Sequence, residues 1–162
     1  LGAKGSSQGK VGDGNVALAS AGAKVHGKFR AQFGSIGENI IDGNASSAEA
    51  AKGSKGFAES AVPTNWIVEL AGLYSLRQIR MKFPDPDKRF YRYVIETSVD
   101  GTSFTKLVDR SQGEWRSWQI VDFPPQAARY IRIRGLHNSA HEFFQLIEFE
   151  AYCKPNSNPP PK

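Results

Sequence analysis

The chain has 162 residues, of which 40% are hydrophobic and 23% are charged, with a formal net charge of +5. This length is typical of one domain, and this apolar fraction is enough for a hydrophobic core. No stretch reaches the roughly 20 consecutive apolar residues of a membrane-spanning helix, and the composition is not that of a disordered chain. Basic and acidic residues are interleaved. We therefore expect no nucleic-acid partner, because phosphate binding usually gathers Lys and Arg on one face.

Both ends of the chain have the composition of linkers. Residues 1–14 contain five glycines and few apolar side chains, and residues 154–162 contain four prolines. Such segments bury too little surface to offset the entropy of ordering them. We predict a flexible linker or cloning remnant over 1–14, one folded module over 15–153 and a proline-rich linker over 154–162, all within a larger protein.

The central region has almost no helical periodicity. Its strongest segments are rich in β-branched and aromatic residues and are bounded by Gly, Pro, Asn or Asp, which is typical of strands. The Asp100-Gly101 pair predicts a hairpin turn, and Pro124-Pro125 predicts the end of a strand. The pattern favours an all-β antiparallel sandwich. The predicted strands are Val16–Ser20, Trp66–Leu70, Leu76–Phe83, Arg92–Ser98, Phe104–Val108, Ser117–Phe123, Arg129–Gly135 and Phe143–Tyr152.

Three polar loops are expected at one end of this sandwich: Pro84–Phe90, Asp109–Arg116 and Leu136–Glu142. Carboxylates, guanidinium groups and amides can hold sugar hydroxyls, and aromatic rings can pack on the apolar faces of a sugar. The alternative is that these are solvated charges and aromatic residues that close the core. The candidate ligand-binding residues are Asp85, Asp87, Arg89, Trp115, Arg116, His137, Asn138, His141 and Phe143.

The IDGNASS segment is rich in oxygen donors, which suits a hard cation such as Ca²⁺, although an Asx-turn that satisfies its own backbone is the alternative. His137 and His141 form only a weak zinc candidate because they fall in a loop. Cys153 is the only cysteine, so it forms no internal disulfide, and we interpret it as a spare thiol. The sequence contains no HExxH or P-loop motif, so we expect no enzyme activity.

Six ordered motifs resemble the discoidin, or coagulation factor V/VIII type C, domain, whose relatives include the galactose-binding-like carbohydrate-binding modules of bacterial enzymes. The resemblance implies a jelly-roll β-sandwich of about eight strands and non-catalytic binding to glycans, lipids or proteins. The loops with FPDPDKRFYRY, DRSQGEWRSWQ and HNSAHEFF also resemble the C-terminal domain of some BTB-containing proteins. The six motifs are NVALAS, IDGN, NWIVELAGLYSLRQIRMKF, YVIETSVDGTSF, ARYIRIRG and LIEFEAY.

The resemblance also assigns roles to individual residues. It matches Asp42 and Glu148 to the calcium ligands of the family, with a hydroxyl from Ser46 or Ser47, and it places Arg89 and Phe143 in the sugar site. With Asn44 of the same turn, the candidate calcium ligands are Asp42, Asn44, Ser47 and Glu148. The chain departs from many relatives in having no Trp soon after IDGN, so the resemblance does not name the sugar.

These observations predict a monomeric carbohydrate-binding module that anchors a larger secreted protein to a glycan or polysaccharide. Its expected partners are that glycan and the other domains of the same polypeptide, in an extracellular, periplasmic or cell-surface location. The alternative is a protein- or membrane-docking discoidin domain. The loops are mostly polar, which disfavours the membrane.

Overall fold

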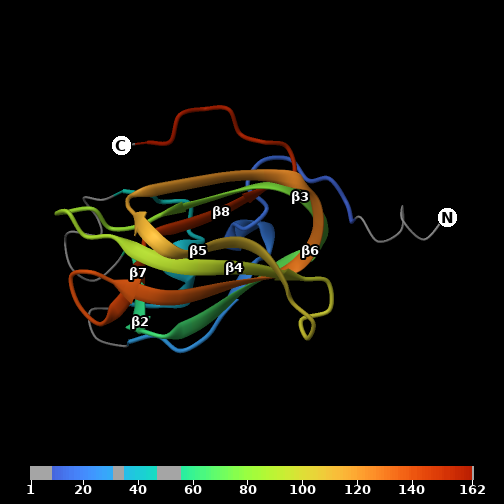
Figure 1. Ribbon diagram of the computed structural model, residues 1–162. Helices are drawn as coiled ribbons and strands as arrows, with labels where there is room; N and C mark the ends of the chain where they lie inside the picture. The colour runs from blue at the N-terminus through green and yellow to red at the C-terminus, as the bar shows by residue number, and fades with distance from the viewer. Residues whose placement is uncertain (1–8, 31–34, 47–55, 162) are drawn as a thin grey trace.

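The computed structural model describes residues 9–30, 35–46 and 56–161, which form a jelly-roll β-sandwich with little helix, as predicted (Figure 1). Two short 3-10 turns, η1 (Ala19–Ala21) and η3 (Gly37–Ile40), precede most of the strands. The strands are β1 (Lys24–His26), β2 (Ala58–Ala61), β3 (Thr64–Lys82), β4 (Tyr91–Ser98), β5 (Thr105–Trp115), β6 (Trp118–Asn138), β7 (Phe143–Leu146) and β8 (Glu148–Tyr152).

All strand pairs are antiparallel. The main sheet has the order β1-β3-β6-β4-β5, and β8 joins it by pairing with β3. Strands β2 and β7 form a separate two-stranded sheet. The segments β3 and β6, of 19 and 21 residues, are each more than three times as long as a typical strand of about 5–6 residues. Both bend, so the main sheet folds over on itself (Figure 1).

The bends divide the main sheet into two layers. The first layer contains β1, residues 64–69 of β3, residues 129–138 of β6, β4 and β5. The second layer contains residues 74–82 of β3, residues 118–128 of β6 and β8. Side chains from both layers meet in the core, where the Phe83 ring stacks on the Tyr91 ring with centroids 4.4 Å apart. Phe144 of β7 packs edge-on against both of these rings.

Several predicted strand limits are wrong. The segment 16–20 contains η1 rather than a strand, and the short strands β1 and β2 were not predicted. The predicted strand pair at 66–70 and 76–83 is one continuous strand, β3, and the predicted final strand is divided into β7 and β8. Pro124-Pro125 does not end a strand either. The two prolines lie in a bulge of β6 between residues paired with Leu76 and Gln78, where the ladder needs no N–H from them.

The turns at the two ends of the sandwich follow the predicted alternation. The β4–β5 turn around Asp100 and the bends of β3 and β6 lie at one end (Figure 1). We call the other end the polar end; it carries the β3–β4 loop (83–90), the β5–β6 turn (116–117) and the β6–β7 turn (139–142). Gly101 lies in the β4–β5 turn with a φ of 84°, a conformation that favours glycine.

Candidate functional site

Hydrogen bonds join the three connections of the polar end. The Phe90 N–H donates to Ser139 Oγ at 2.9 Å, and the Ser139 N–H donates to the Phe90 carbonyl at 3.0 Å. The Arg116 Nε donates to the Lys88 carbonyl at 3.1 Å. The predicted convergence of three sequence-distant segments at one end of the sandwich is therefore present in the structure.

The segment 109–116 differs from its predicted loop. Most of it belongs to β5, which pairs with β4 as Tyr93 with Arg110 and as Tyr91 with Trp115. One residue on β4 thus opposes four on β5, and residues 111–114 form a wide bulge. Gly113 in this bulge has a φ of 89°. The bulge pushes the polar residues of this segment outward while Trp115 returns to the ladder.

Arg89 is the most firmly held candidate residue at the polar end. Its Nε and one terminal nitrogen donate to the two carboxylate oxygens of Asp87 at 2.8 and 3.0 Å, and the other terminal nitrogen donates to Gln145 Oε1 at 2.9 Å. The Arg89 side chain is only 14% exposed. These bonds use three of the five N–H donors of the guanidinium, and the Tyr91 hydroxyl is a further partner. These bonds lower the pKa of Asp87 to about 2 and raise the pKa of Arg89.

A chain of polar contacts continues from Arg89 into the protein. Gln145 Nε2 donates to Glu59 Oε1 at 3.0 Å, and Arg30 donates to Glu59 Oε2 at 3.2 Å. Glu59 is 4% exposed. Arg30 of a loop, Glu59 of β2 and Gln145 of β7 were not among the predicted site residues. They could have been found as polar residues at inward positions of otherwise apolar segments, since buried polar residues need partners.

Three further candidates surround this chain of contacts. The Arg30 guanidinium lies over the Phe143 ring, 4.2 Å from its centroid, and the His141 ring meets Phe143 edge-on. His141 Nδ1 accepts a hydrogen bond from the Phe143 N–H at 3.2 Å, which leaves Nε2 for a ligand. Partial burial and the charge of Arg89 lower the pKa of His141, which favours the neutral ring. Asn138 is buried and supports the turn, donating to the Phe143 carbonyl.

The remaining candidates form a second group on the outer side of the polar end. The Phe90 ring lies near the His137 ring and the Arg116 guanidinium, with centroid distances of 5.5 Å to each. The Arg110 guanidinium lies over the Trp115 ring, 3.7 Å from the ring centroid, and covers one face of the indole. Asp85 accepts a hydrogen bond from Ser117 Oγ at 2.5 Å. The contacts among the described residues thus separate Trp115, Arg116 and His137 from the group around Arg89.

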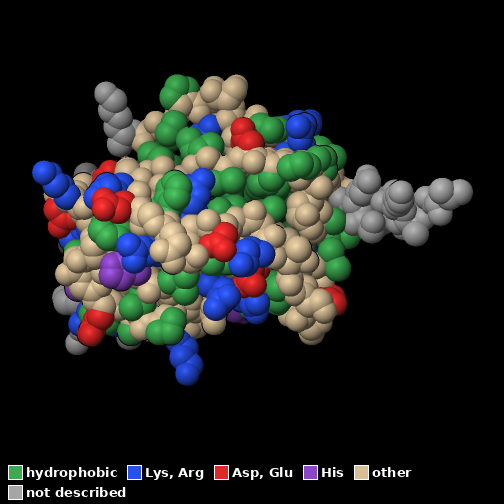
Figure 2. Space-filling view, viewed as in Figure 1, with side chains coloured by type: hydrophobic (Ala, Val, Ile, Leu, Met, Phe, Trp, Pro, Cys, Tyr) green, Lys and Arg blue, Asp and Glu red, His purple; other side chains and the backbone are tan. Residues whose placement is uncertain are grey.

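Charges of both signs lie close together on one face of the molecule (Figure 2). Figure 2 shows Lys and Arg side chains interleaved with Asp and Glu on the coloured part of the face in view. No helix among the described residues is long and apolar enough to cross a membrane.

The predicted calcium turn lies against the last strand. Glu148 is fully buried, and its Oε2 accepts a hydrogen bond from the Gly43 N–H at 2.8 Å. Its Oε1 has no hydrogen-bond partner. Burial and the neighbouring Asp42 carboxylate raise the pKa of Glu148 to about 10. A buried carboxylate with an unpartnered oxygen beside a second carboxylate is the arrangement that a bound cation would stabilise, so these residues fit Ca²⁺.

Of the other two predicted calcium ligands, the structure describes only Asn44. Asn44 Oδ1 accepts the Ser46 N–H at 3.0 Å, as the Asx-turn alternative requires, and Ser47 lies outside the described residues. Lys82 donates to the Ala45 carbonyl at 3.1 Å. Within the described ranges, no group of three or more His, Cys, Asp and Glu side chains could hold a metal. A calcium ion here would therefore need amide, hydroxyl or backbone oxygens beside Asp42 and Glu148.

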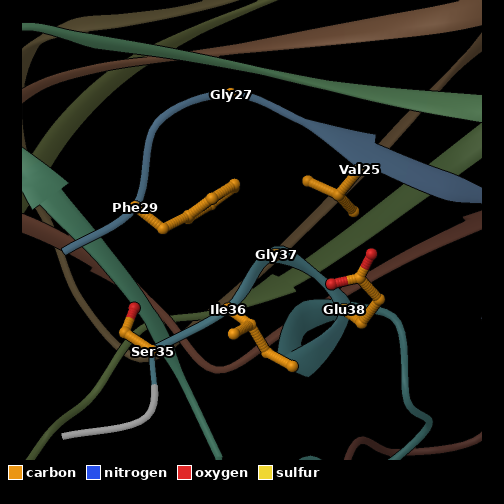
Figure 3. Close-up of a pocket in the computed structure, with 7 residues that line it drawn as sticks. All are labelled: Val25, Gly27, Phe29, Ser35, Ile36, Gly37 and Glu38. Carbon is orange, nitrogen blue, oxygen red and sulfur yellow. The ribbon is translucent and has the colours of Figure 1, made fainter. Parts of the chain in front are cut away.

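A pocket of about 430 Å³ lies between β1 and η3 (Figure 3). Its walls include the apolar side chains of Val25, Phe29 and Ile36, with the carboxylate of Glu38 at one side. Among the described residues that line it, none is a predicted ligand-binding residue, and the polar side chains are those of Ser35 and Glu38.

A sequence model of the F5/8 type C domain matches residues 25–149, which is most of the chain. The chain belongs to the F5/8 type C domain family. The predicted resemblance is therefore confirmed, and the jelly-roll fold is the one seen in solved galactose-binding-like modules.

Among curated proteins, this F5/8 type C domain is similar to the human BTB/POZ domain-containing protein 9. The two are 40% identical over 84 residues, which is 52% of this chain. The matched region is 14% of the human protein, so the chain spans only a small part of that relative.

Solved structures with the same fold include two bacterial modules. One is the family 32 carbohydrate-binding module of Clostridium perfringens NanJ in complex with galactose, which is 15% identical and has a TM-score of 0.67, with 85% of this chain and 96% of that chain covered. The other is chitosan-binding module 1 from a Paenibacillus chitosanase/glucanase. It is 19% identical with a TM-score of 0.67, and the match covers 85% of this chain and 98% of that one.

Proposed function

We propose that this domain is a non-catalytic carbohydrate-binding module and that the group around Arg89 binds the sugar. The observation that carries the proposal is the fixed Arg89 guanidinium, which Asp87 and Gln145 hold in place at the polar end. A preorganised guanidinium loses little conformational entropy when it binds hydroxyl oxygens.

The neighbouring side chains supply the other contacts that a sugar needs. Asp87 is exposed and can accept from a hydroxyl, while His141 Nε2 can donate to another. The Phe143 ring carries Arg30 on one face, so its other face or edge is the apolar contact we assign to the sugar ring. The similarity in fold to modules solved with galactose and other sugars supports this class of ligand.

In a larger protein, such a module would hold its parent on a glycan or polysaccharide at an extracellular or cell-surface location. Anchoring and location are parts of the proposal that a binding experiment on the isolated domain does not address. They are tested by comparing attachment of the parent protein to cells with and without the Arg89 substitution.

The first test is a glycan array followed by titration of a positive sugar. We expect Arg89→Ala to weaken binding at least tenfold, because a charge-assisted hydrogen bond contributes about 1.5–3 kcal/mol. Arg77→Ala, which removes an exposed arginine from β3, is the matched control and should bind like the parent chain. Each variant is first checked for a native melting curve.

Substitutions of two aromatic residues distinguish between the group around Arg89 and the second group of candidate residues at the polar end. Phe143→Ala should weaken sugar binding, whereas Trp115→Ala should leave it within twofold if the sugar sits beside Arg89. The reverse result would move the site to the group around Phe90. If neither aromatic substitution nor Arg89→Ala changes the affinity, the polar end is not the sugar site.

The second candidate function is protein docking, favoured by the 40% identity to a BTB/POZ protein over half of the chain. Binding to a protein partner that persists after enzymatic removal of its glycans would support docking. Binding that disappears with the glycans supports the carbohydrate-binding proposal.

We also propose that Asp42, Asn44, Ser47 and Glu148 hold a structural Ca²⁺. When bound, the ion would neutralise the two carboxylates and fix the turn after η3 to β8. The unpartnered Glu148 Oε1 is the described atom that supports this proposal.

Removal of the ion is the test. A ligand that binds only the native state stabilises it by about 2.7 kcal/mol at a hundredfold excess over Kd. Excess EDTA should therefore lower the melting temperature by several degrees, and Asp42→Ala should abolish this sensitivity. Identical melting curves with EDTA and with added calcium, together with metal analysis that detects no calcium, would contradict the site.

A further inference from the structure

The C-terminal tail does not extend away from the sandwich. Residues 156–161 return along the outer face of the second layer, over β3, β6 and β8 (Figure 1). The sequence predicts a proline-rich linker over residues 154–162, and those limits stay a prediction. Hydrogen bonds of the described residues show that this segment contacts the sheet.

Gln78 of β3 recognises the backbone of the tail. Its Oε1 accepts the Asn156 N–H at 3.0 Å, and its Nε2 donates to the Asn156 carbonyl at 3.4 Å. Asp122 on the adjacent strand holds the same amide group by accepting from Nε2 at 2.8 Å. The Gln78 side chain thus both accepts from and donates to the backbone of Asn156, as the backbone of a neighbouring strand would.

Arg80 is the central residue of this face. It is only 4% exposed, and one of its terminal nitrogens donates to the carbonyls of both Asn156 and Asn158. Among the described residues Arg80 forms no ion pair, and its Nε has no hydrogen-bond partner. A buried guanidinium needs such partners, so the tail carbonyls compensate the burial of its charge.

The far end of the face holds the prolines. Trp118 Nε1 donates to the Pro161 carbonyl at 2.8 Å. Because each proline has a fixed φ and no N–H, residues 159–161 are already extended before they bind and leave no donor unsatisfied. Indole and guanidinium groups that read carbonyls along an extended, proline-rich chain are a known mode of peptide recognition.

We propose that the outer face of the second layer is a groove for an extended, proline-rich segment, and that residues 156–161 occupy it as a built-in ligand. The groove is lined by Gln78, Arg80, Trp118 and Tyr152. Its contacts with the tail are mainly to backbone carbonyls. Recognition therefore depends on the extended conformation of the segment and on the positions of the prolines in its sequence.

The direct test supplies the tail as a separate peptide. A variant that ends at Pro155 is titrated with the peptide KPNSNPPPK, and the indole signal of Trp118 is followed by NMR. Truncation should shift this signal, and the peptide should return it to its position in the full chain with a saturable curve. A short tether gives an effective concentration of about 1 mM, so Kd for the peptide should lie at or below this value.

Two controls make the result specific. Arg80→Met should weaken peptide binding at least tenfold, whereas Arg77→Met, a matched change on the same strand outside the groove, should not. The rearranged peptide KPPPNSNPK has the same composition and should bind at least tenfold more weakly. A Trp118 signal that responds to neither truncation nor peptide would overturn the proposal.

If the shortened chain does not fold, amide hydrogen exchange of the full chain provides the answer. The Asn156 N–H should exchange at least tenfold more slowly than an unstructured amide, and Arg80→Met should remove this protection while Arg77→Met keeps it. Exchange of the Asn156 amide at the unstructured rate in the parent chain would overturn the proposal. Neither outcome depends on whether the polar end binds sugar.

Discussion

Glu59 shows how one buried carboxylate can hold a candidate binding residue, Arg89, that it does not touch. It accepts from Arg30 and from Gln145, and Gln145 in turn accepts from Arg89. We expect Glu59→Gln to lower the free energy of unfolding by about 1–3 kcal/mol, because an amide has one acceptor oxygen and leaves one of the two donors unpaired. Urea denaturation measures this change.

The control for Glu59 is Glu142→Gln, which makes the same chemical change at an exposed position of the polar end. It should alter the free energy of unfolding by less than about 0.5 kcal/mol. Equal effects of the two substitutions would mean that the contacts of Glu59 contribute nothing to stability.

At the scale of the elements, the contact between β6 and β7 depends on a missing side chain. A Cβ added to Gly135 would lie 2.3 Å from Cγ of Phe144, a fully buried ring that also packs against Trp66. Gly135→Ala should therefore destabilise the fold by about 1–3 kcal/mol or more through overpacking. Gly72→Ala, whose added Cβ meets only the flexible end of Lys10, should have a much smaller effect.

A double substitution tests this explanation of Gly135→Ala. Phe144→Ala removes the ring atoms that the added Cβ would meet, so the two changes together should cost less than the sum of their separate effects. Strictly additive effects in thermal unfolding would show that the two residues do not compete for space.

The same elements show what sequence patterns could predict. Alternating segments such as 129–135 were placed correctly because their periodicity reports a single buried face. The continuity of β6 was missed because a proline's effect depends on whether its N–H faces a partner, and pairing with β3 is not visible in the sequence. Arg30, Glu59 and Gln145 were missed for the same reason, since they are brought together only by tertiary contacts.

For the whole molecule, the pH dependence of stability should change with calcium. Without the ion, Glu148 is protonated in the folded chain up to about pH 10, whereas its unfolded value is 4.5. Its contribution to the free energy of unfolding is then fully present below pH 4.5. As pH rises above this value the free energy of unfolding falls, by at most about 1.4 kcal/mol per pH unit. The pKa values of Asp87 and Asp109 are lowered to about 2, so these two groups act in the opposite sense and their contribution to the free energy of unfolding is lost as pH falls below 3.8.

Melting temperatures between pH 3 and pH 9 measure this profile. In EDTA the stability should decline from about pH 5 upward, and Glu148→Gln should flatten the decline. With saturating calcium, binding requires the ionised carboxylate, so the stabilisation by the ion should grow with pH. A parent chain in EDTA that is equally stable at pH 5 and pH 8 would contradict this assignment of the Glu148 proton.

The two long strands also determine how the domain responds to heat. Because β3 and β6 each pass through both layers, the two layers share continuous backbone as well as the core. Trp66 reports on the first layer and Trp118 on the second. The two indoles should therefore lose their native environments in one thermal transition.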